Sequence, residues 1–190
     1  ANRPVSVASI AVDLAKRIFD RLAEKTVMVI GSGVIGESLI RHLVENGVRG
    51  LMITNRTFEK AVDLAARFEA SPIRFEDYSR YLKLADVVIG SVESGQALIT
   101  RETAIEVLRE RKQDNMFLID LGVPRNFDPL INDLDNVYLY HIDDLAGLAQ
   151  ENLKGRESEA DKGELIVDEE VETFYQWFTA LDQVPTIVAL

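Results

Sequence analysis

Three glycines, Gly31, Gly33 and Gly36, form a G-x-G-x-x-G pattern between a short apolar run and a segment with helical periodicity. In a strand–turn–helix unit the first glycine permits a tight turn. The second lets the backbone approach a pyrophosphate, and the third lets helix and strand pack closely. Free N–H groups and the positive end of the helix dipole favour an anion there. The pattern predicts a dinucleotide-binding turn made of Gly31, Ser32, Gly33, Val34, Ile35 and Gly36.

The residues after the next apolar run, 51–54, predict which dinucleotide is bound. An NAD site usually places an aspartate or glutamate here to accept hydrogen bonds from the ribose hydroxyls. This chain instead has Asn55, Arg56 and Thr57, with Lys60 one turn further on. A guanidinium and an ammonium suit a 2′-phosphate, which favours NADPH. The alternative is that Thr57 only caps a helix and Arg56 is an ordinary surface arginine.

Two later loops are candidates for the rest of the cofactor site. In a doubly wound sheet, the loops at the carboxyl ends of the strands line the cofactor crevice. Ser91 and Val92 follow the apolar run 85–89, so we expect them along the ribose and diphosphate, although an ordinary turn is the alternative. Gly122 follows the run 116–120 and would let the backbone approach the nicotinamide.

The elements that must position these residues alternate between strand and helix. This alternation predicts an α/β fold: a Rossmann-type doubly wound parallel sheet flanked by helices, with a C-terminal helical extension. The expected strands are 26–30, 51–54, 73–75, 85–89, 116–120 and 137–140. The expected helices are 5–24, 36–46, 57–70, 76–84 and 100–111. Helical spacing places Val62 and Tyr81 in the core, and Pro72 is expected to break the third helix.

Composition limits the possible functions. The chain has 190 residues, a formal net charge of −11 and no cysteine. Such an acidic chain is not expected to bind nucleic acid through a broad basic surface, and a cysteine nucleophile within it is excluded. No apolar run is long enough to span a membrane and no signal-peptide pattern is present, so a cytoplasmic location is expected. A start at Ala1 is consistent with a piece of a longer protein.

The pattern changes beyond residue 142. Residues 150–164 are almost entirely polar, and apolar residues then return at helical spacing at Val171, Phe174 and Phe178. The chain offers no domain to cover this apolar face, so self-association is expected. We therefore expect a packing helix at 1–24, an NADP-binding domain at 25–142, and a helical linker with the start of a dimerisation region at 143–190.

Several sequence blocks together resemble the glutamyl-tRNA reductase family, and their order along nearly the whole chain is that of the family. The blocks are Ser6–Lys16, Val29–Gly36, Asn55–Thr57, Asp120–Pro129, Val137–Leu145 and Val184–Leu190. The glycine block is generic, whereas the blocks beyond Asp120 are specific in combination. Four positions depart from the usual family residues: Ser32 and Gly122 replace alanine, Ile35 replaces methionine, and His141 replaces aspartate or asparagine.

The resemblance implies a three-domain protein. An N-terminal domain carries a cysteine that takes the glutamyl group from glutamyl-tRNA, and a Rossmann domain supplies NADPH for reduction to glutamate-1-semialdehyde in tetrapyrrole synthesis. A C-terminal helical domain forms a homodimer. This chain would be the middle domain with the start of the connecting helix, and would be inactive alone. Carried over by position, 31–36 would hold the pyrophosphate, and Asn55, Arg56 and Thr57 with Lys60 would hold the 2′-phosphate. Ser91, Val92 and Gly122 would line the ribose and nicotinamide.

Two other interpretations remain open from the sequence. A shikimate-dehydrogenase-like NADP domain shares the Asn55-Arg56-Thr57 feature, although the polar stretch and apolar helix after residue 150 argue against it. A non-catalytic module that senses NADP or dimerises is the third interpretation. A cysteine-bearing domain upstream of Ala1 would favour the reductase over that module.

Overall fold

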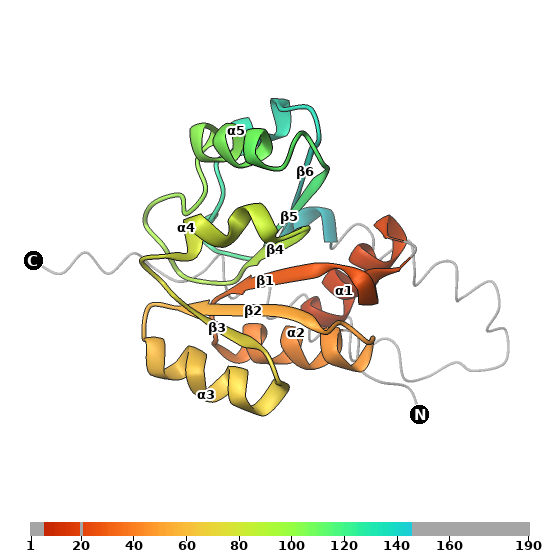
Figure 1. The fold of residues 1–190 in the computed structure, drawn as a ribbon, viewed down its shortest axis with the longest axis vertical. Coiled ribbons are helices and arrows are strands. Elements are labelled where there is room, and N and C mark those ends of the chain that lie inside the picture. The colour runs from red at the N-terminus through yellow and green to blue at the C-terminus, as the bar shows by residue number, and fades with distance from the viewer. Residues whose placement is uncertain (1–5, 20, 146–190) are drawn as a thin grey trace, which may run out of the picture.

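The chain folds around one parallel sheet, which the computed structural model describes for residues 6–19 and 21–145 (Figure 1). The six strands lie in the order β3-β2-β1-β4-β5-β6, and every neighbouring pair is parallel. The order reverses direction between β1 and β4, which is the switch point where open α/β sheets bind ligands. The strands are β1 (Thr26–Ile30), β2 (Gly50–Asn55), β3 (Ser71–Arg74), β4 (Val87–Gly90), β5 (Met116–Asp120) and β6 (Val137–His141). This arrangement confirms the Rossmann-type α/β fold for the described residues.

Helices connect the strands and cover the sheet (Figure 1). The α-helices are α1 (Val7–Ile18), α2 (Val34–Glu45), α3 (Phe58–Phe68), α4 (Tyr78–Tyr81) and α5 (Arg101–Glu110). The 3₁₀ helices are η1 (Leu22–Glu24), η2 (Leu82–Leu84) and η3 (Pro129–Asp133). Ser6 begins α1 with a capping box, in which its hydroxyl accepts from the Ser9 N–H and the Ser9 hydroxyl accepts from the Ser6 N–H.

Alternate residues of the central strands supply two separate cores. In β1, Val27 and Val29 pack with α1, α2 and α3, whereas Met28 and Ile30 pack on the opposite face with α5, η2 and η3. Successive strand side chains point to opposite faces, so a strand that is apolar throughout is buried on both. The sheet is therefore rigidly held between helical layers, and its carboxyl edge is a stable platform for a site.

The predicted first helix is shorter in the structure. We expected one helix over 5–24, but α1 ends at Ile18 and a 3₁₀ turn follows at Leu22. Phe19 leaves the helical conformation, with φ −115° and ψ 119°, and its ring meets the Phe117 ring edge-on at a centroid distance of 4.6 Å. Such an aromatic pair favours this placement over one more helical turn.

Three other local expectations were wrong. Val62 is 39% exposed, because the buried strip of α3 runs through Ala61, Leu64 and Ala65. Tyr81 is 37% exposed, because α4 is a single turn that continues as the 3₁₀ helix η2. Pro72 does not break a helix but lies within β3, an edge strand, where a missing N–H is tolerated. The expectations for 146–190, including the apolar helix and the dimerisation region, concern a segment outside the described residues.

Candidate functional site

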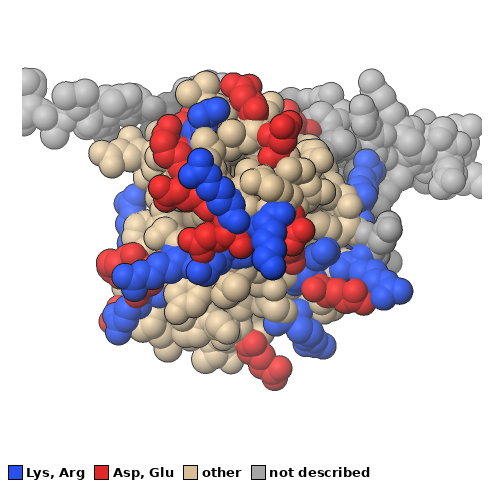
Figure 2. Space-filling view, turned by 45° about the horizontal axis from the view of Figure 1, so that its top comes forward, with Lys and Arg blue, Asp and Glu red and all other residues tan. Residues whose placement is uncertain are grey.

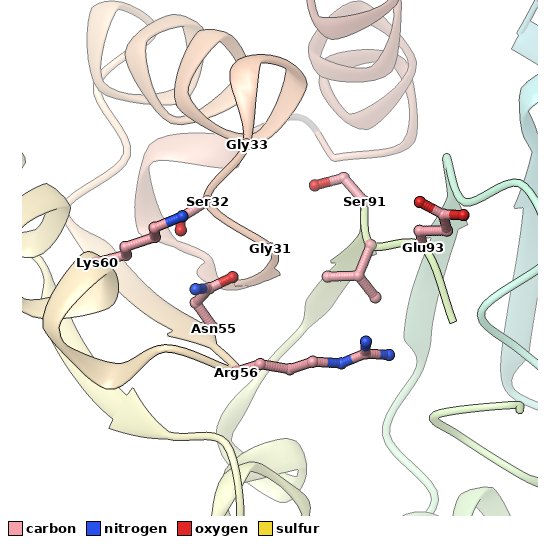
Figure 3. Close-up of a pocket in the computed structure, with 9 residues that line it drawn as sticks. Gly31, Ser32, Gly33, Asn55, Arg56, Lys60, Ser91 and Glu93 are labelled. Atoms are coloured by element: carbon pink, nitrogen blue, oxygen red, sulfur yellow. The ribbon is translucent and has the colours of Figure 1, made fainter. Parts of the chain in front are cut away.

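A pocket opens at the carboxyl ends of β1, β2 and β4, on either side of the switch point (Figure 3). It is lined by Gly31, Ser32, Gly33, Asn55, Arg56, Lys60, Ser91, Val92 and Glu93. The structure thus brings eight of the thirteen predicted site residues together from three separate segments of the chain. Their common place at one sheet edge follows from the parallel register, in which Ile30 pairs with both Thr54 and Gly90.

The floor of the pocket is the turn between β1 and α2. Gly31 has φ +115°, which side chains rarely allow, and a Cβ there would lie 2.7 Å from the Ser91 carbonyl oxygen. The Gly31 N–H donates to the Thr54 carbonyl oxygen at 2.8 Å, which fixes the turn against β2. A Cβ on Gly36 would overlap the Gly31 carbonyl oxygen. The first and third glycines are therefore required by packing, as their spacing predicts.

Gly33 differs from the other two glycines. A Cβ built on it meets nothing within 4 Å, so the fold itself does not need glycine there. Gly33 is the N-cap of α2 and no side chain caps the helix start. Open space beside uncapped N–H groups is what an approaching anion needs.

The polar groups around this turn also suit an anion. The Ser32 hydroxyl oxygen is buried without a hydrogen-bond partner. Lys60 reaches toward Ser32, while Arg56 extends across the pocket toward the side that carries Glu93 (Figure 3). Within residues 6–19 and 21–145, neither Arg56 nor Lys60 makes an ion pair. Two unpaired cations, an unpaired hydroxyl and a cradle that a Cβ would fill together fit a phosphorylated dinucleotide.

The structure does not support the alternative in which Thr57 serves only as a side-chain cap of a helix. It occupies the N-cap position of α3, but its side chain makes no capping hydrogen bond. Its carbonyl oxygen instead accepts from the Asn55 side-chain amide at 3.1 Å. The Asn55-Arg56-Thr57 turn is therefore not explained by helix capping alone.

Five predicted site residues do not line the pocket. Val34 is 89% exposed, Ile35 packs against the core, and Gly36 is buried against the turn. Thr57 lies just outside, and Gly122 packs against the Asn126 side chain. A direct contact of these five with a cofactor stays a prediction.

Glu93 and Asn126 were not among the residues predicted from the sequence. Glu93 lines the pocket directly after Val92, and its position beyond the end of β4 was a usable signal. Asn126 is fully buried behind the pocket wall and bonds to Val92, 34 residues earlier in the chain. No sequence pattern connects residues so far apart.

One face of the molecule carries both signs of charge. On the face drawn in Figure 2, Lys and Arg side chains alternate with Asp and Glu rather than forming a broad basic surface. Among the described residues no cluster of acidic residues and histidines could hold a metal ion. No helix within the described part of the chain is long and apolar enough to cross a membrane.

Comparison with known proteins agrees with the geometry. Residues 13–148 match the family model for shikimate/quinate 5-dehydrogenase. A glutamyl-tRNA reductase from Geobacter metallireducens is 48% identical over 190 residues, which is all of this chain and 44% of that protein. The chain therefore spans less than half the length of the curated relatives it matches.

Solved structures show the same relationship. The glutamyl-tRNA reductase from Methanopyrus kandleri superposes with a TM-score of 0.77 at 34% identity, covering 95% of this chain and 46% of that one. A shikimate 5-dehydrogenase from Thermus thermophilus, solved with NADP(H) and shikimate, reaches a TM-score of 0.53 at 17% identity, covering 78% of this chain and 56% of that one. At that identity the likeness to the dehydrogenase concerns the fold alone.

Proposed function

The chain belongs to the shikimate/quinate 5-dehydrogenase family, and we propose that it is the NADPH-binding part of a glutamyl-tRNA reductase. The curated relatives that it matches are glutamyl-tRNA reductases. The observation that carries the proposal is a pair of cations, Arg56 and Lys60, that form no ion pair with any residue the structure describes. They lie beside a glycine turn whose Ser32 hydroxyl has no hydrogen-bond partner among the same residues. A carboxylate at the end of β2 would have favoured NAD, and none is present.

Each segment of the pocket has a distinct part in this proposal. The turn 31–36 receives the pyrophosphate at the start of α2. Arg56 and Lys60, with Asn55 and Thr57, receive the 2′-phosphate, and Ser91, Val92 and Gly122 flank the ribose and nicotinamide. When bound, NADPH supplies a hydride, which in the whole protein reduces the glutamyl group delivered by glutamyl-tRNA.

The division into 1–24, 25–142 and 143–190 belongs to the same proposal, as do a cytoplasmic location and a homodimer formed through the last segment. The glutamyl-tRNA would be bound by the part of the protein that this chain does not contain. On its own, the chain is expected to bind the cofactor without catalysing the overall reduction.

Arg56→Ala is expected to weaken NADPH binding about tenfold or more, since a lost hydrogen bond to a charged group costs about 1.5–3 kcal/mol. NADH lacks the 2′-phosphate, so its affinity should change little and the preference for NADPH should shrink. Calorimetric titration of both cofactors measures this. Arg80→Ala is the matched control, because Arg80 pairs with Asp77 on the surface outside the pocket. Equal losses for NADPH and NADH would contradict the assignment of Arg56.

A shikimate-dehydrogenase activity is the competing function, and its test is direct. With shikimate and NADP⁺ the chain should produce no NADPH, measured by absorbance. If shikimate drove the reduction of NADP⁺ at a rate typical of an enzyme, the chain would be assigned that dehydrogenase activity in place of the reductase.

A further inference from the structure

The wall of the pocket that faces Arg56 depends on one buried side chain. Beyond Ser91, whose N–H donates to the Ile30 carbonyl oxygen at 2.8 Å, the chain leaves β4 and has no strand or helix until α5. At Val92, the Asn126 side-chain amide makes the two backbone hydrogen bonds that a neighbouring strand would make. Its Oδ1 accepts from the Val92 N–H at 3.1 Å, and its Nδ2 donates to the Val92 carbonyl oxygen at 2.8 Å.

The backbone of the same residue holds the far end of the loop. The Leu98 N–H donates to the Asn126 carbonyl oxygen at 2.6 Å. Both ends of the loop 92–98 are therefore attached to Asn126, one through its side chain and the other through its main chain. Asn126 is 0% exposed, so water does not compete for these bonds.

Two glycines make room for the amide. A Cβ on Gly122 would overlap the Asn126 side-chain amide, and a Cβ on Gly90 would lie 2.9 Å from its Oδ1. These glycines stand at the carboxyl ends of β4 and β5, where the strands meet the pocket. Gly122 therefore has a role besides the cofactor contact that its position suggested: the absence of a Cβ makes room for the side chain that holds Val92.

Asp120 in turn fixes the backbone of the loop that follows β5. Its Oδ2 accepts from the Asn126 N–H at 2.7 Å and the Phe127 N–H at 2.9 Å, and its Oδ1 accepts from the Gly122 N–H at 2.9 Å. Burial raises the pKa of the Asp120 carboxyl, and these three donors oppose that rise. Because the main chain of Asn126 is held by Asp120, its side chain can be changed without releasing the loop from β5.

We propose that Asn126 is a positioning residue for the cofactor, holding Val92 in the pocket wall while touching no ligand itself. The inference rests on the proposed function, since it assumes that the pocket binds a dinucleotide. An amide is suited to the task because it offers a donor and an acceptor side by side, whereas a carboxylate only accepts. Val92 and Ser91 contact parts common to NADPH and NADH, so the effect is independent of the 2′-phosphate.

The test combines amide hydrogen exchange with cofactor titration on three variants of the chain. In Asn126→Ala, the Val92 amide should lose protection while the Leu98 amide keeps it, because the Leu98 acceptor is a main-chain oxygen. NADPH and NADH affinities should both fall about tenfold, leaving their ratio unchanged. Asn126→Asp keeps the acceptor for the Val92 N–H but turns a second acceptor toward the Val92 carbonyl oxygen, so its cofactor affinities should be no higher than those of Asn126→Ala. Asn46→Ala, which removes an exposed amide bonded to the His42 carbonyl, is the matched control and should change nothing.

Several outcomes would overturn the proposal. If the Val92 amide of Asn126→Ala lost protection while cofactor affinity stayed the same, the pocket wall would not need Asn126 for cofactor binding. Loss of protection at both Val92 and Leu98, or unfolding of both Asn126 variants, would make Asn126 a stability residue only. A changed NADPH-to-NADH ratio would place its effect at the 2′-phosphate. Failure of wild type to bind either cofactor would instead refute the proposed function, and the exchange pattern would still report whether Asn126 holds Val92.

Discussion

Gly36→Ala is expected to destabilise the fold by about 1–3 kcal/mol, the usual cost of overpacking, and to weaken cofactor binding about 100-fold or more. The added Cβ would overlap the Gly31 carbonyl oxygen, which is backbone and cannot turn aside as a side chain could. Relief requires α2 to move away from β1, and that movement opens the turn proposed to hold the pyrophosphate. Urea denaturation and NADPH titration measure the two effects.

Two other glycines separate packing from binding in the same experiment. The Cβ added by Gly33→Ala meets nothing within 4 Å, so the free energy of unfolding should stay near wild type. NADPH binding should weaken, because the methyl group occupies the space through which the pyrophosphate approaches the turn. Gly95→Ala also meets nothing and lies outside the pocket, so both quantities should be unchanged. If Gly33→Ala bound NADPH as tightly as Gly95→Ala, the turn would not be the pyrophosphate site.

Arg111→Met is expected to lower the free energy of unfolding by about 1.5–3 kcal/mol, the usual cost of losing hydrogen bonds to a charged group. The Arg111 side chain is only 6% exposed. Its guanidinium donates to the Lys83, Ala85 and Asn115 carbonyl oxygens at 3.0, 2.8 and 3.0 Å, and to Asp86 Oδ1 at 3.0 Å. Methionine fills much of the volume but removes the donor to these carbonyl oxygens and to Asp86 Oδ1, and leaves Asp86 with only the Thr26 N–H on its other oxygen.

The control for Arg111 is the same substitution at an exposed pair. Arg80 is 80% exposed in its contact with Asp77, so Arg80→Met should leave the denaturation midpoint unchanged. Both variants should keep the slope of unfolding free energy against urea, since the surface exposed on unfolding is the same. A midpoint for Arg111→Met equal to that of Arg80→Met would show that the buried network contributes nothing to stability.

The main architecture could be predicted because its signals are local. Each buried strand is a continuous apolar run, and Ser6 and Thr100 are helix caps whose hydroxyls accept from the Ser9 and Thr103 N–H groups. The parallel order then brings the residues after β1, β2 and β4 to one edge. For this reason the pocket could be anticipated from three short segments.

The errors occurred where contacts between distant residues decide the conformation. Helix α1 stops early because Phe19 packs on Phe117, and no pattern within residues 5–24 contains that partner. The buried strip of α3 runs through Ala61, Leu64 and Ala65, and Val62 faces outward. Such tertiary contacts override local periodicity.

The support behind the site was invisible for the same reason. Asp120 could be recognised as the end of a strand, but its three backbone donors belong to a loop whose path the sequence does not specify. The bonds between Asn126 and Val92 likewise depend on the relative placement of β4 and β5. The sequence was a better guide to the residues that line the pocket than to those that hold them in place.

Titration of the unaltered chain with NADPH and, under identical conditions, with NADH tests the central claim most directly. Arg56 after β2 and Lys60 in α3 make no ion pair with the other described residues, and no carboxylate follows β2 directly. We therefore predict that NADPH binds about tenfold or more tightly than NADH. Equal affinities, or a preference for NADH, would contradict the account.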